Sequence, residues 1–418
     1  MYKLINYSKN IKNNIYCKFS HFNFDKCYFS SKKIEKPKQY PKHPYFSSGP
    51  CKKRPGWSPR VLSYNTIGRS HRSTVCKSKI KEAISKTREI LQIPDDYLIG
   101  IVPASDTGAF EMCLWSMLGC NPVDVCYWES FGKGWYTDIN QHLKIDNVRE
   151  FNASYGNIPN LNETSPDHDV VFTYNGTTSG VCVPNLDWIS DARTGLTFND
   201  ATSAVFAMNI DWTKVDVTTY SWQKVLGGEG GHGMIILSPR AVERLETFVP
   251  DRPLPKIFRL TKQVDGETKV NKGIFQGATI NTPSMLCIED YVDALNWVEH
   301  IGGLEATIEK SKKNLNIIEK FCEKHKWIDF LASSPDFRSN TSVCLTLRLT
   351  EKEITEMVEI LEIENVACDI NSYRDSPPGL RIWCGATVEE DDLRLLMEWI
   401  EWSYNKINLR NYKDNYIT

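Results

Sequence analysis

The sequence predicts an α/β protein whose large domain has a mostly parallel sheet and is followed by a smaller α+β domain. Apolar runs alternate with stretches long enough for helices, such as 108–118; the runs occupy 97–102, 123–127, 169–174, 195–198, 204–208 and 215–220. This alternation is typical of βαβ units, in which helices cover the faces of a parallel sheet. After about residue 285 the chain changes to long charged amphipathic segments, which indicates a second domain.

The individual elements follow from local patterns. Residues 41–60 are crowded with Pro, Gly and Ser, which predicts an irregular arm before a helix that begins near Cys76. The run GMIILS at 233–238 predicts a further strand. In the C-terminal part we expect helices over 285–326, 352–363 and 388–405 and strands at 343–348 and 380–384. These patterns place the large domain at 41–300 and the small domain at 301–418.

The composition excludes several classes of protein. The chain has 418 residues, of which 41% are hydrophobic, and this is enough for a sizeable core. Lys and Arg number 50 against 52 for Asp and Glu, so no strong overall charge attracts nucleic acid or an anionic membrane. No apolar run approaches the roughly 20 residues that a membrane helix needs. The 13 cysteines include no C-x-x-C pair and no Cys/His cluster, which favours reduced thiols over disulfides or a metal site.

Residues 1–40 differ in composition from the rest of the chain. They contain nine Lys against only Asp25 and Glu35, and no apolar run that could serve in a secretory signal. Such a basic segment is typical of an organelle-targeting extension, although it contains no Arg, and a disordered tail is the alternative. We therefore expect a targeting extension that leads to the mitochondrial matrix, or otherwise a cytoplasmic protein.

Two residues in the middle of the chain have the chemistry of a pyridoxal phosphate site. Asp200 stands at the end of one apolar run, and Lys224 follows the β-rich run VTTYSW. Parallel strands deliver such groups to a shared crevice, so the acid and the lysine are expected to be neighbours. Pyridoxal phosphate needs this pair: a lysine for the Schiff base and a carboxylate that keeps the pyridine nitrogen protonated. Either residue alone would be interpreted as a surface lysine or a helix-capping aspartate.

The glycines after Lys224 allow a second interpretation. Gly228, Gly230 and Gly233 match the pattern G-x-G-x-x-G of dinucleotide-binding proteins. That fingerprint must follow a strand and open a helix, whereas a strand is predicted directly after these glycines. We therefore interpret them as a tight turn that leaves room for a cofactor.

Several motifs in this order resemble those of the phosphoserine aminotransferases, in the variant form found in some bacteria and archaea. These are fold type I pyridoxal phosphate enzymes, and the resemblance implies a seven-stranded sheet in the large domain. It runs from FSSGP (46–50) to GLRIWCGA (379–386), about four fifths of the chain. It implies that Lys224 is the Schiff-base lysine, that Gln223 approaches the cofactor phosphate and that Asp200 pairs with the pyridine nitrogen.

A phosphate site is indicated at PASDTGAFEM, residues 103–112. Ser105, Asp106 and Thr107 stand at the entry of an apolar-periodic helix, where free backbone N–H groups bind anions. An ordinary Ser or Asp cap of the helix is the alternative. Many relatives have an arginine where Thr107 stands, so the resemblance implies backbone contacts more than a side-chain role for this residue.

Further motifs resemble the parts of the family that contact the cofactor ring. Trp128 in VCYWESFGKGW matches the aromatic residue that stacks on the pyridine, with Phe131 as the fallback. Thr177 in TYNGTTSGV matches the threonine that hydrogen-bonds to the ring hydroxyl, and Thr178 is the near alternative.

The resemblance also implies the substrate contacts. His71 and Arg72 in GRSHRS resemble the pair that holds the phosphate of phosphoserine or the distal carboxylate of glutamate, although a basic loop of this kind is often only solvated. Arg381 resembles the arginine that binds the α-carboxylate, and Ser48 a second donor to it. Arg374 is an additional candidate for the phosphate pocket.

A homodimer is implied by ATINTPSM, residues 278–285. Asn281 and Thr282 resemble the donors that reach the cofactor phosphate of the neighbouring subunit, while capping of the next helix by Thr282 or Ser284 is the ordinary interpretation.

The expected activity is transfer of the amino group of L-glutamate to 3-phosphohydroxypyruvate, which gives O-phospho-L-serine and 2-oxoglutarate. Another acceptor such as 3-hydroxy-2-oxo-4-phosphobutanoate is the first alternative, and an inert binding protein with this fold is the second. A cysteine desulfurase is disfavoured because no Cys lies between 288 and 321, where a mobile nucleophile would be needed.

Overall fold

The computed structural model describes residues 35–416, of which 36–416 belong to one compact unit. Most of the predicted N-terminal extension therefore lies outside the described residues. Residues 36–40 are described and pack on the C-terminal part of the chain, where Trp399 Nε1 donates to the carbonyl of Gln39 at 2.8 Å and Tyr40 lies against the same indole. The part of the extension next to residue 41 is thus packed. The predicted boundary at 300/301 stays a prediction.

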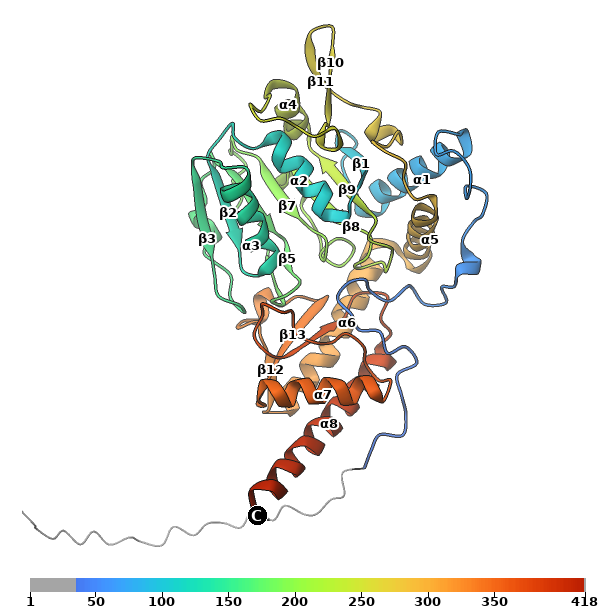
Figure 1. Ribbon diagram of the computed structural model, residues 1–418, viewed down its shortest axis with the longest axis vertical. Helices are drawn as coiled ribbons and strands as arrows, with labels where there is room; N and C mark the ends of the chain where they lie inside the picture. The colour runs from blue at the N-terminus through green and yellow to red at the C-terminus, as the bar shows by residue number, and fades with distance from the viewer. Residues whose placement is uncertain (1–34, 417–418) are drawn as a thin grey trace, which may run out of the picture. The chain divides into compact units, whose positions relative to one another are not determined.

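A seven-stranded sheet forms the centre of the N-terminal part (Figure 1). Its strands are β1 (Leu98–Pro103), β2 (Val123–Tyr127), β3 (Val148–Asn152), β4 (Asp169–Thr173), β7 (Thr197–Asp200), β8 (Val217–Ser221) and β9 (His232–Leu237). The spatial order is β1-β9-β8-β7-β4-β2-β3. Pairing is parallel from β8 through β3, and β9 is antiparallel to both of its neighbours. The predicted mostly parallel sheet is confirmed.

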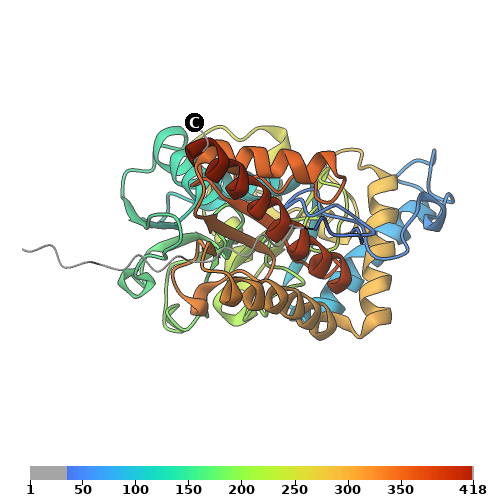
Figure 2. The ribbon, with the colours of Figure 1, turned by 90° about the horizontal axis from the view of Figure 1, so that it is seen from below.

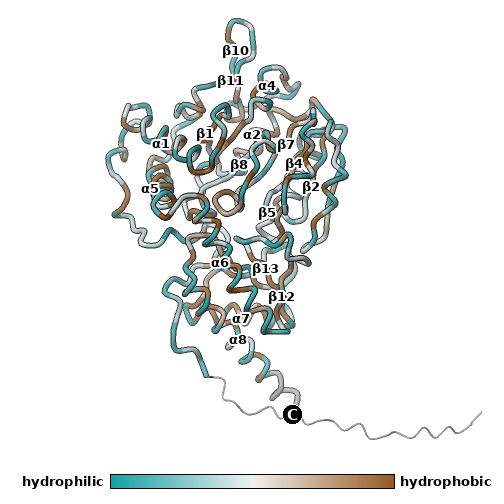
Figure 3. The backbone as a smooth tube through the Cα atoms, turned by 180° about the vertical axis from the view of Figure 1, so that it is seen from behind, coloured by the Kyte–Doolittle hydropathy of each residue, from teal (hydrophilic) through white to brown (hydrophobic). Residues whose placement is uncertain are grey.

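Helices cover this sheet because each buries one apolar stripe against it. The helices are α1 (Thr74–Leu91), α2 (Ser105–Met117), α3 (Ser130–Thr137), α4 (Pro239–Thr247) and α5 (Met285–Ile301). Helix α2 packs on β8 and β9, α3 packs on β2 and β4, and α1 packs on α5. The core between α2 and the sheet contains Phe110, Leu114 and Phe198, all fully buried. Figure 3 shows the central strands in brown and the outer hairpin β10–β11 mostly in teal.

The C-terminal part is a smaller α+β arrangement, as predicted. Its three-stranded antiparallel sheet consists of β12 (Ile328–Phe330), β13 (Ser342–Leu347) and β14 (Leu380–Trp383). Its helices are α6 (Gly303–Lys324), α7 (Glu351–Ile363) and α8 (Glu390–Tyr416). Helix α8 packs on α6 and α7, and Figure 2 shows the three together. The irregular arm also reaches this part, since the backbone N–H of Trp383 donates to the carbonyl of Phe46.

One apolar run is not a strand. Residues 204–208 form consecutive turns, in which the N–H groups of Ala204 and Val205 both bond to the carbonyl of Ala201. Phe206 has a φ of 67°, a left-handed conformation that is incompatible with a strand. The run is apolar because these turns are buried between the two parts of the chain, and burial alone does not distinguish a strand from a loop.

Other short elements carried no clear sequence signal. Two short strand pairs are β5 (Asn175–Gly176) with β6 (Val181–Cys182), and β10 (Thr261–Val264) with β11 (Glu267–Val270). Short 3-10 helices lie at Pro59–Val61, Leu161–Glu163, Trp212–Lys214, Lys256–Phe258, Ile274–Gln276 and Pro335–Phe337, and a π-helical turn at Asp138–His142. No helix among residues 35–416 is long and apolar enough to cross a membrane.

A buried ionic cluster at Asp216 joins three segments, and its removal is expected to destabilise the fold. The Asp216 carboxylate is 1% exposed and accepts from Arg240 Nη1 at 3.0 Å and from Arg193 Nη2 at 3.3 Å. Asp216→Ala leaves both guanidinium groups without this partner, so the free energy of unfolding should fall by about 3–5 kcal/mol. Denaturant unfolding measures the change. Glu267→Ala, which removes an exposed ion pair, should leave unfolding unchanged; equal behaviour of the two variants would contradict the prediction.

Candidate active site

Asp200 and Lys224 lie at the same edge of the seven-stranded sheet. Asp200 is the last residue of β7, and Lys224 follows the end of the adjacent parallel strand β8 by three residues. Both side chains are buried, with exposed fractions of 5% and 9%. The structure therefore brings the predicted acid and lysine to one crevice, at the carboxyl ends of parallel strands.

The amine of Lys224 is held in a buried and crowded position. Its Nζ donates to the carbonyl of Ser48 in the FSSGP motif. Gly49 has a φ of 150°, and a Cβ there would lie 2.6 Å from Nζ, so the arm passes directly over the lysine. Burial lowers the pKa of Lys224, and the charge of Arg381 adds to this effect while Asp200 opposes it. A lowered pKa provides the neutral amine that a nucleophile or base requires.

Asp200 is fixed by two donors. Trp135 Nε1 donates to its Oδ2 at 3.1 Å, and the backbone N–H of Thr202 donates to Oδ1 at 3.0 Å. Trp135 lies on α3, where its ring packs on Phe110. No motif in the sequence had pointed to Trp135. The available signal was an apolar tryptophan in the short helix directly after Trp128, but nothing in the sequence pairs that helix with β7.

The start of α2 differs from the expected arrangement. The residue that caps the helix is Ala104, which has a φ of 68° and no side-chain hydrogen bond, so neither Ser105 nor Asp106 is an ordinary cap. Asp106 is buried, and burial and the nearby charge of Asp200 raise its pKa well above the usual range. The Asp106 side chain therefore lies inside the protein, near Asp200. Thr107 is exposed at the helix start, where its hydroxyl and the free N–H groups are available to an anion.

Trp128 and the turn at 175–178 form a further wall. Trp128 is 1% exposed and its Nε1 donates to the carbonyl of Val181 at 2.9 Å. Thr177 Oγ1 lies 2.9 Å from Ser203 Oγ, and Thr178 Oγ1 donates to Glu129 Oε2 at 2.8 Å. Both threonine hydroxyls thus have partners inside the chain. Phe131, the fallback, is 41% exposed and lies against Tyr373, away from this wall.

Several buried polar atoms around this crevice have no hydrogen-bond partner in the described residues. They include Asp106 Oδ1, Thr202 Oγ1, Thr219 Oγ1, Gln223 Oε1 and Arg381 Nε. Unsatisfied buried polar groups are costly, so such a cluster indicates a polar ligand. Hydroxyl, amide and guanidinium groups together with a lysine and an acid suit a phosphorylated pyridine. No group of three His, Cys, Asp or Glu side chains in the described chain could hold a metal ion.

Arg381 lies on β14 at the rim of an open cavity of about 270 Å³. Among residues 35–416 its guanidinium has no ion pair and no hydrogen bond, and its Cζ lies over the ring of Tyr373, 5.5 Å from the centroid. Arg374 lines the same cavity, while Ser48 Oγ lies 3.2 Å from Ser342 Oγ. A guanidinium without a protein partner at a cavity rim is suited to bind an anionic ligand.

Two predicted pairs do not join this crevice within one chain. His71 and Arg72 lie in the loop before α1, and neither side chain has a hydrogen bond or ion pair with any other described residue. Arg72 is exposed, as are Asn281 and Thr282 before α5. The two segments lie at the same end of the α1–α5 helix pair, because Thr66 Oγ1 donates to Glu289 of α5 and Gly277 packs on α1.

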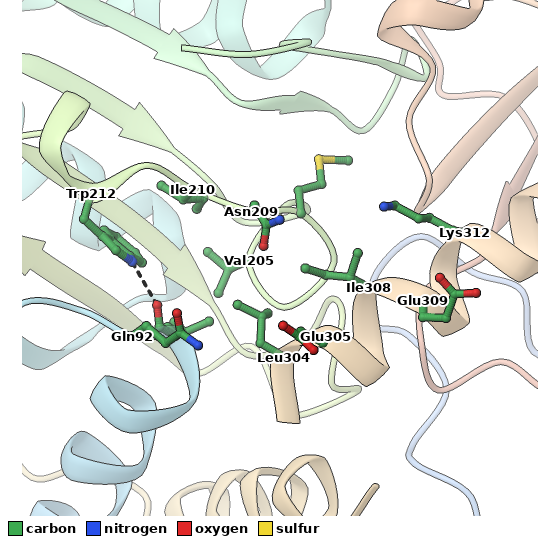
Figure 4. Close-up of a pocket in the computed structure, with 12 residues that line it drawn as sticks. Gln92, Val205, Asn209, Ile210, Trp212, Leu304, Glu305, Ile308, Glu309 and Lys312 are labelled. Atoms are coloured by element: carbon green, nitrogen blue, oxygen red, sulfur yellow. Dashed lines mark hydrogen bonds between the residues drawn. The ribbon is translucent and has the colours of Figure 1, made fainter. Parts of the chain in front are cut away.

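A larger cavity, of about 560 Å³, lies elsewhere (Figure 4). It is formed by the end of α1, the turns after β7 and the start of α6, and Figure 4 shows Val205, Trp212 and Ile308 around it. None of the predicted site residues lines it. Volume alone therefore does not identify the active site; the unpaired polar groups and the buried lysine do.

Comparisons with known proteins show the fold and the family of this chain. The structure superposes on the phosphoserine aminotransferase of Cytophaga hutchinsonii with a TM-score of 0.73 at 20% identity, over 85% of this chain and 98% of that one. It superposes on a pyridoxal phosphate-bound phosphoserine aminotransferase of Trichomonas vaginalis with a TM-score of 0.71 at 17% identity, over 86% and 100%. These likenesses show the fold of the type I pyridoxal phosphate aminotransferases.

The sequence comparison identifies the family within this class. The chain is 59% identical over 372 residues to the phosphoserine aminotransferase of Methanosarcina barkeri, which covers 89% of this chain and all of that protein. No family model matches the chain. The chain belongs to the phosphoserine aminotransferase family.

Trp135→Phe is expected to weaken catalysis without disturbing the fold. The variant keeps the ring contact with Phe110 and loses only the hydrogen bond to Asp200, which is then less well oriented. Hydrogen bonds to charged groups contribute about 1.5–3 kcal/mol, so kcat/KM should fall roughly 10- to 100-fold. Steady-state kinetics measures the loss. Trp188→Phe, which removes an indole hydrogen bond to Asn185, is the control; similar losses in both variants would contradict the assignment.

Proposed function

We propose that this chain transfers the amino group of L-glutamate to 3-phosphohydroxypyruvate and so produces O-phospho-L-serine and 2-oxoglutarate. The observation that carries the proposal is the buried pair of Asp200 and Lys224 beside a guanidinium, that of Arg381, without a protein partner. The 59% identity to a phosphoserine aminotransferase supports the choice of substrates. An inert binding protein would not need a lysine whose pKa is lowered by burial.

The residues around the crevice suit pyridoxal phosphate. When bound, this cofactor supplies an electron sink that draws electrons from the Cα of the amino acid. Thr107 and the N–H groups at the start of α2, together with Gln223, would hold its phosphate. Trp128 and Thr177 would contact the ring, and Asp200 would hold a proton at the ring nitrogen.

Lys224 is assigned the proton transfer. Its neutral amine would take the proton from the Cα of glutamate onto Nζ and deliver it in the later half of the same exchange. Burial favours the neutral form over a wider range of pH than for an exposed lysine, because the charged form is desolvated. In the half-reaction with 3-phosphohydroxypyruvate, the same amine would carry out these proton transfers in the reverse order.

Arg381 is assigned the α-carboxylate that both substrates share. A planar guanidinium can make two parallel hydrogen bonds to a carboxylate, and the Arg381 side chain has no ion pair in the described residues that would compete. Ser48 would add a donor from the arm. Arg374 lines the same cavity and is exposed; its ion pair with Asp375, at 3.6 Å, is also exposed, so a second anionic group can reach Arg374.

We also propose that two copies of the chain form a homodimer in which each completes the other's site. The loop with His71 and Arg72 and the segment with Asn281 and Thr282 lie at one end of the helix pair α1–α5, and Arg72, Asn281 and Thr282 are exposed. In a homodimer, Asn281 and Thr282 would contact the neighbouring cofactor phosphate and Arg72 the substrate phosphate. The basic composition of residues 1–40 supports the further proposal of import into the mitochondrial matrix.

Lys224→Ala tests the reaction itself. Without the amine, the purified protein should lose the visible absorbance band of the covalently held cofactor, and turnover should fall by at least roughly 10³-fold because the base is missing. Absorbance is recorded while glutamate and then phosphohydroxypyruvate are added. Lys214→Ala removes a lysine whose partner is Asp191, far from the crevice, and should behave as wild type. Full activity of Lys224→Ala, or an unchanged spectrum of the wild type on adding glutamate, would refute the function.

Arg72→Leu tests the contribution across subunits. Loss of a charged contact to the substrate phosphate should lower kcat/KM on the order of 30- to 1000-fold, with the cofactor spectrum unchanged. Mixed dimers of Arg72→Leu with Lys224→Ala contain one site with an intact Lys224 and an intact Arg72 from the other chain. Mixing should therefore restore activity if Arg72 acts across the interface, and restore none if it acts within its own chain.

A further inference from the structure

We propose that Glu129 is a positioning residue that locks the wall carrying Trp128 onto the turn that carries Thr177 and Thr178. The inference rests on the proposed cofactor role of this crevice, and it does not depend on which acceptor the enzyme uses. Glu129 follows Trp128 in the chain, and no sequence motif had assigned it a role.

The carboxylate of Glu129 joins two elements at once. It caps helix α3, because the backbone N–H of Gly132 donates to Oε1 at 2.7 Å. Its other oxygen, Oε2, accepts from Thr178 Oγ1 at 2.8 Å. The side chain is 3% exposed, so water does not compete for either bond. One carboxylate thus fixes the start of α3 relative to the turn between β5 and β6.

The two segments also interlock sterically. A Cβ at Gly176 would lie 2.8 Å from Glu129 Cγ and 3.0 Å from Trp128 Nε1, so only glycine allows this close approach. Trp128 Nε1 donates in turn to the carbonyl of Val181, just past the same turn. Displacing Glu129 would therefore shift both the indole wall and the Thr177 hydroxyl.

Glu129 also changes charge in the neutral range. Burial raises its pKa to about 7, and the hydrogen bonds from Gly132 and Thr178 oppose that shift. The titratable groups that face it from other elements are Asp200 at the end of β7, Lys224 after β8, Cys344 on β13 and, through Thr178, Tyr155. The acid is thus ionised above about pH 7 and neutral below it.

A chain of hydroxyl groups connects this buried acid to the surface. Thr178 Oγ1 lies 3.3 Å from the Tyr155 hydroxyl, which lies 2.7 Å from Ser130 Oγ. Ser130 Oγ reaches the exposed carboxylate of Asp375 at 3.4 Å. Glu129 can therefore exchange its proton with solvent along this chain while it remains buried.

The charge state decides how firmly the two elements are joined. The ionised carboxylate accepts both hydrogen bonds, and charge-assisted bonds are roughly twice as strong as neutral ones. The neutral acid carries its proton on Oε2 and donates it to Thr178. It then accepts only the hydrogen bond from Gly132, and neither bond is charge-assisted. Glutamine at this position reproduces the neutral arrangement at every pH, because its amide also donates to Thr178.

Binding of pyridoxal phosphate to the full-length apoenzyme, followed by fluorescence titration between pH 6 and 8.5, tests the proposal. Glu129→Leu should weaken cofactor binding roughly 10- to 100-fold, since both bonds are lost. Glu129→Gln should match wild type near pH 6 and bind roughly 5- to 30-fold more weakly above pH 8, with the difference appearing at a midpoint near 7. Thr178→Val should weaken binding less than Glu129→Leu. In the Glu129→Gln/Thr178→Val double variant, the two effects should not add.

Thr350→Ala is the matched control, because it also removes the side-chain cap of one helix, α7, away from the crevice. It should lower the melting temperature and leave the cofactor affinity unchanged. Wild-type affinity in Glu129→Leu, or a Glu129→Gln that tracks wild type across the whole pH range, would overturn the role of Glu129. If Glu129→Leu does not fold, the Glu129→Gln and Thr178→Val titrations still decide. Failure of the wild type to bind the cofactor would instead overturn the proposed function, and this inference with it.

Discussion

Removal of the Lys224 amine from water is the constraint on which the arrangement of the crevice depends. The arm at Ser48 and Gly49 has to cross directly over Nζ, and this crossing ties the N-terminal segment to the end of β8. The arm continues to the C-terminal part, where Phe46 bonds to Trp383 on β14 next to Arg381. The same segment therefore covers the lysine and holds the substrate arginine near it.

Carboxylates around the crevice serve different purposes because their surroundings differ. Asp200 receives two donors and stays beside the lysine, whereas Asp106 is buried next to Asp200 with an oxygen that has no partner. Burial raises the pKa of Asp106, so the pair need not hold two negative charges at one point. Glu129 lies at the opposite wall and is held by α3 and the β5–β6 turn. The three carboxylates differ in role because their surroundings differ, and not because of residue type.

Two exposed segments carry predicted site residues that lie outside the crevice of their own chain. Arg72 and Thr282 have no role that one chain can explain, and both lie on the same end of the α1–α5 pair. A ligand bound by another subunit would give both exposed segments a role. The proposed dimer thus follows from a feature that is incomplete in the single chain.

The sequence by itself predicted six of the seven strands of the sheet, all but β3, and the order of most elements, because apolar periodicity is a local signal. It also predicted the lysine and the acid of the crevice from their places at strand ends, and the arginine from the resemblance of its motif to the family. The apolar run at 204–208 predicted a strand, but these residues form buried turns. Burial produces the same apolar pattern in a strand and in a buried turn. Only the tertiary structure decided that Trp135 holds Asp200, that Asp106 points inward and that Glu129 joins two walls. Each of these contacts joins residues 49 or more positions apart, and no local pattern records which helix packs on which strand.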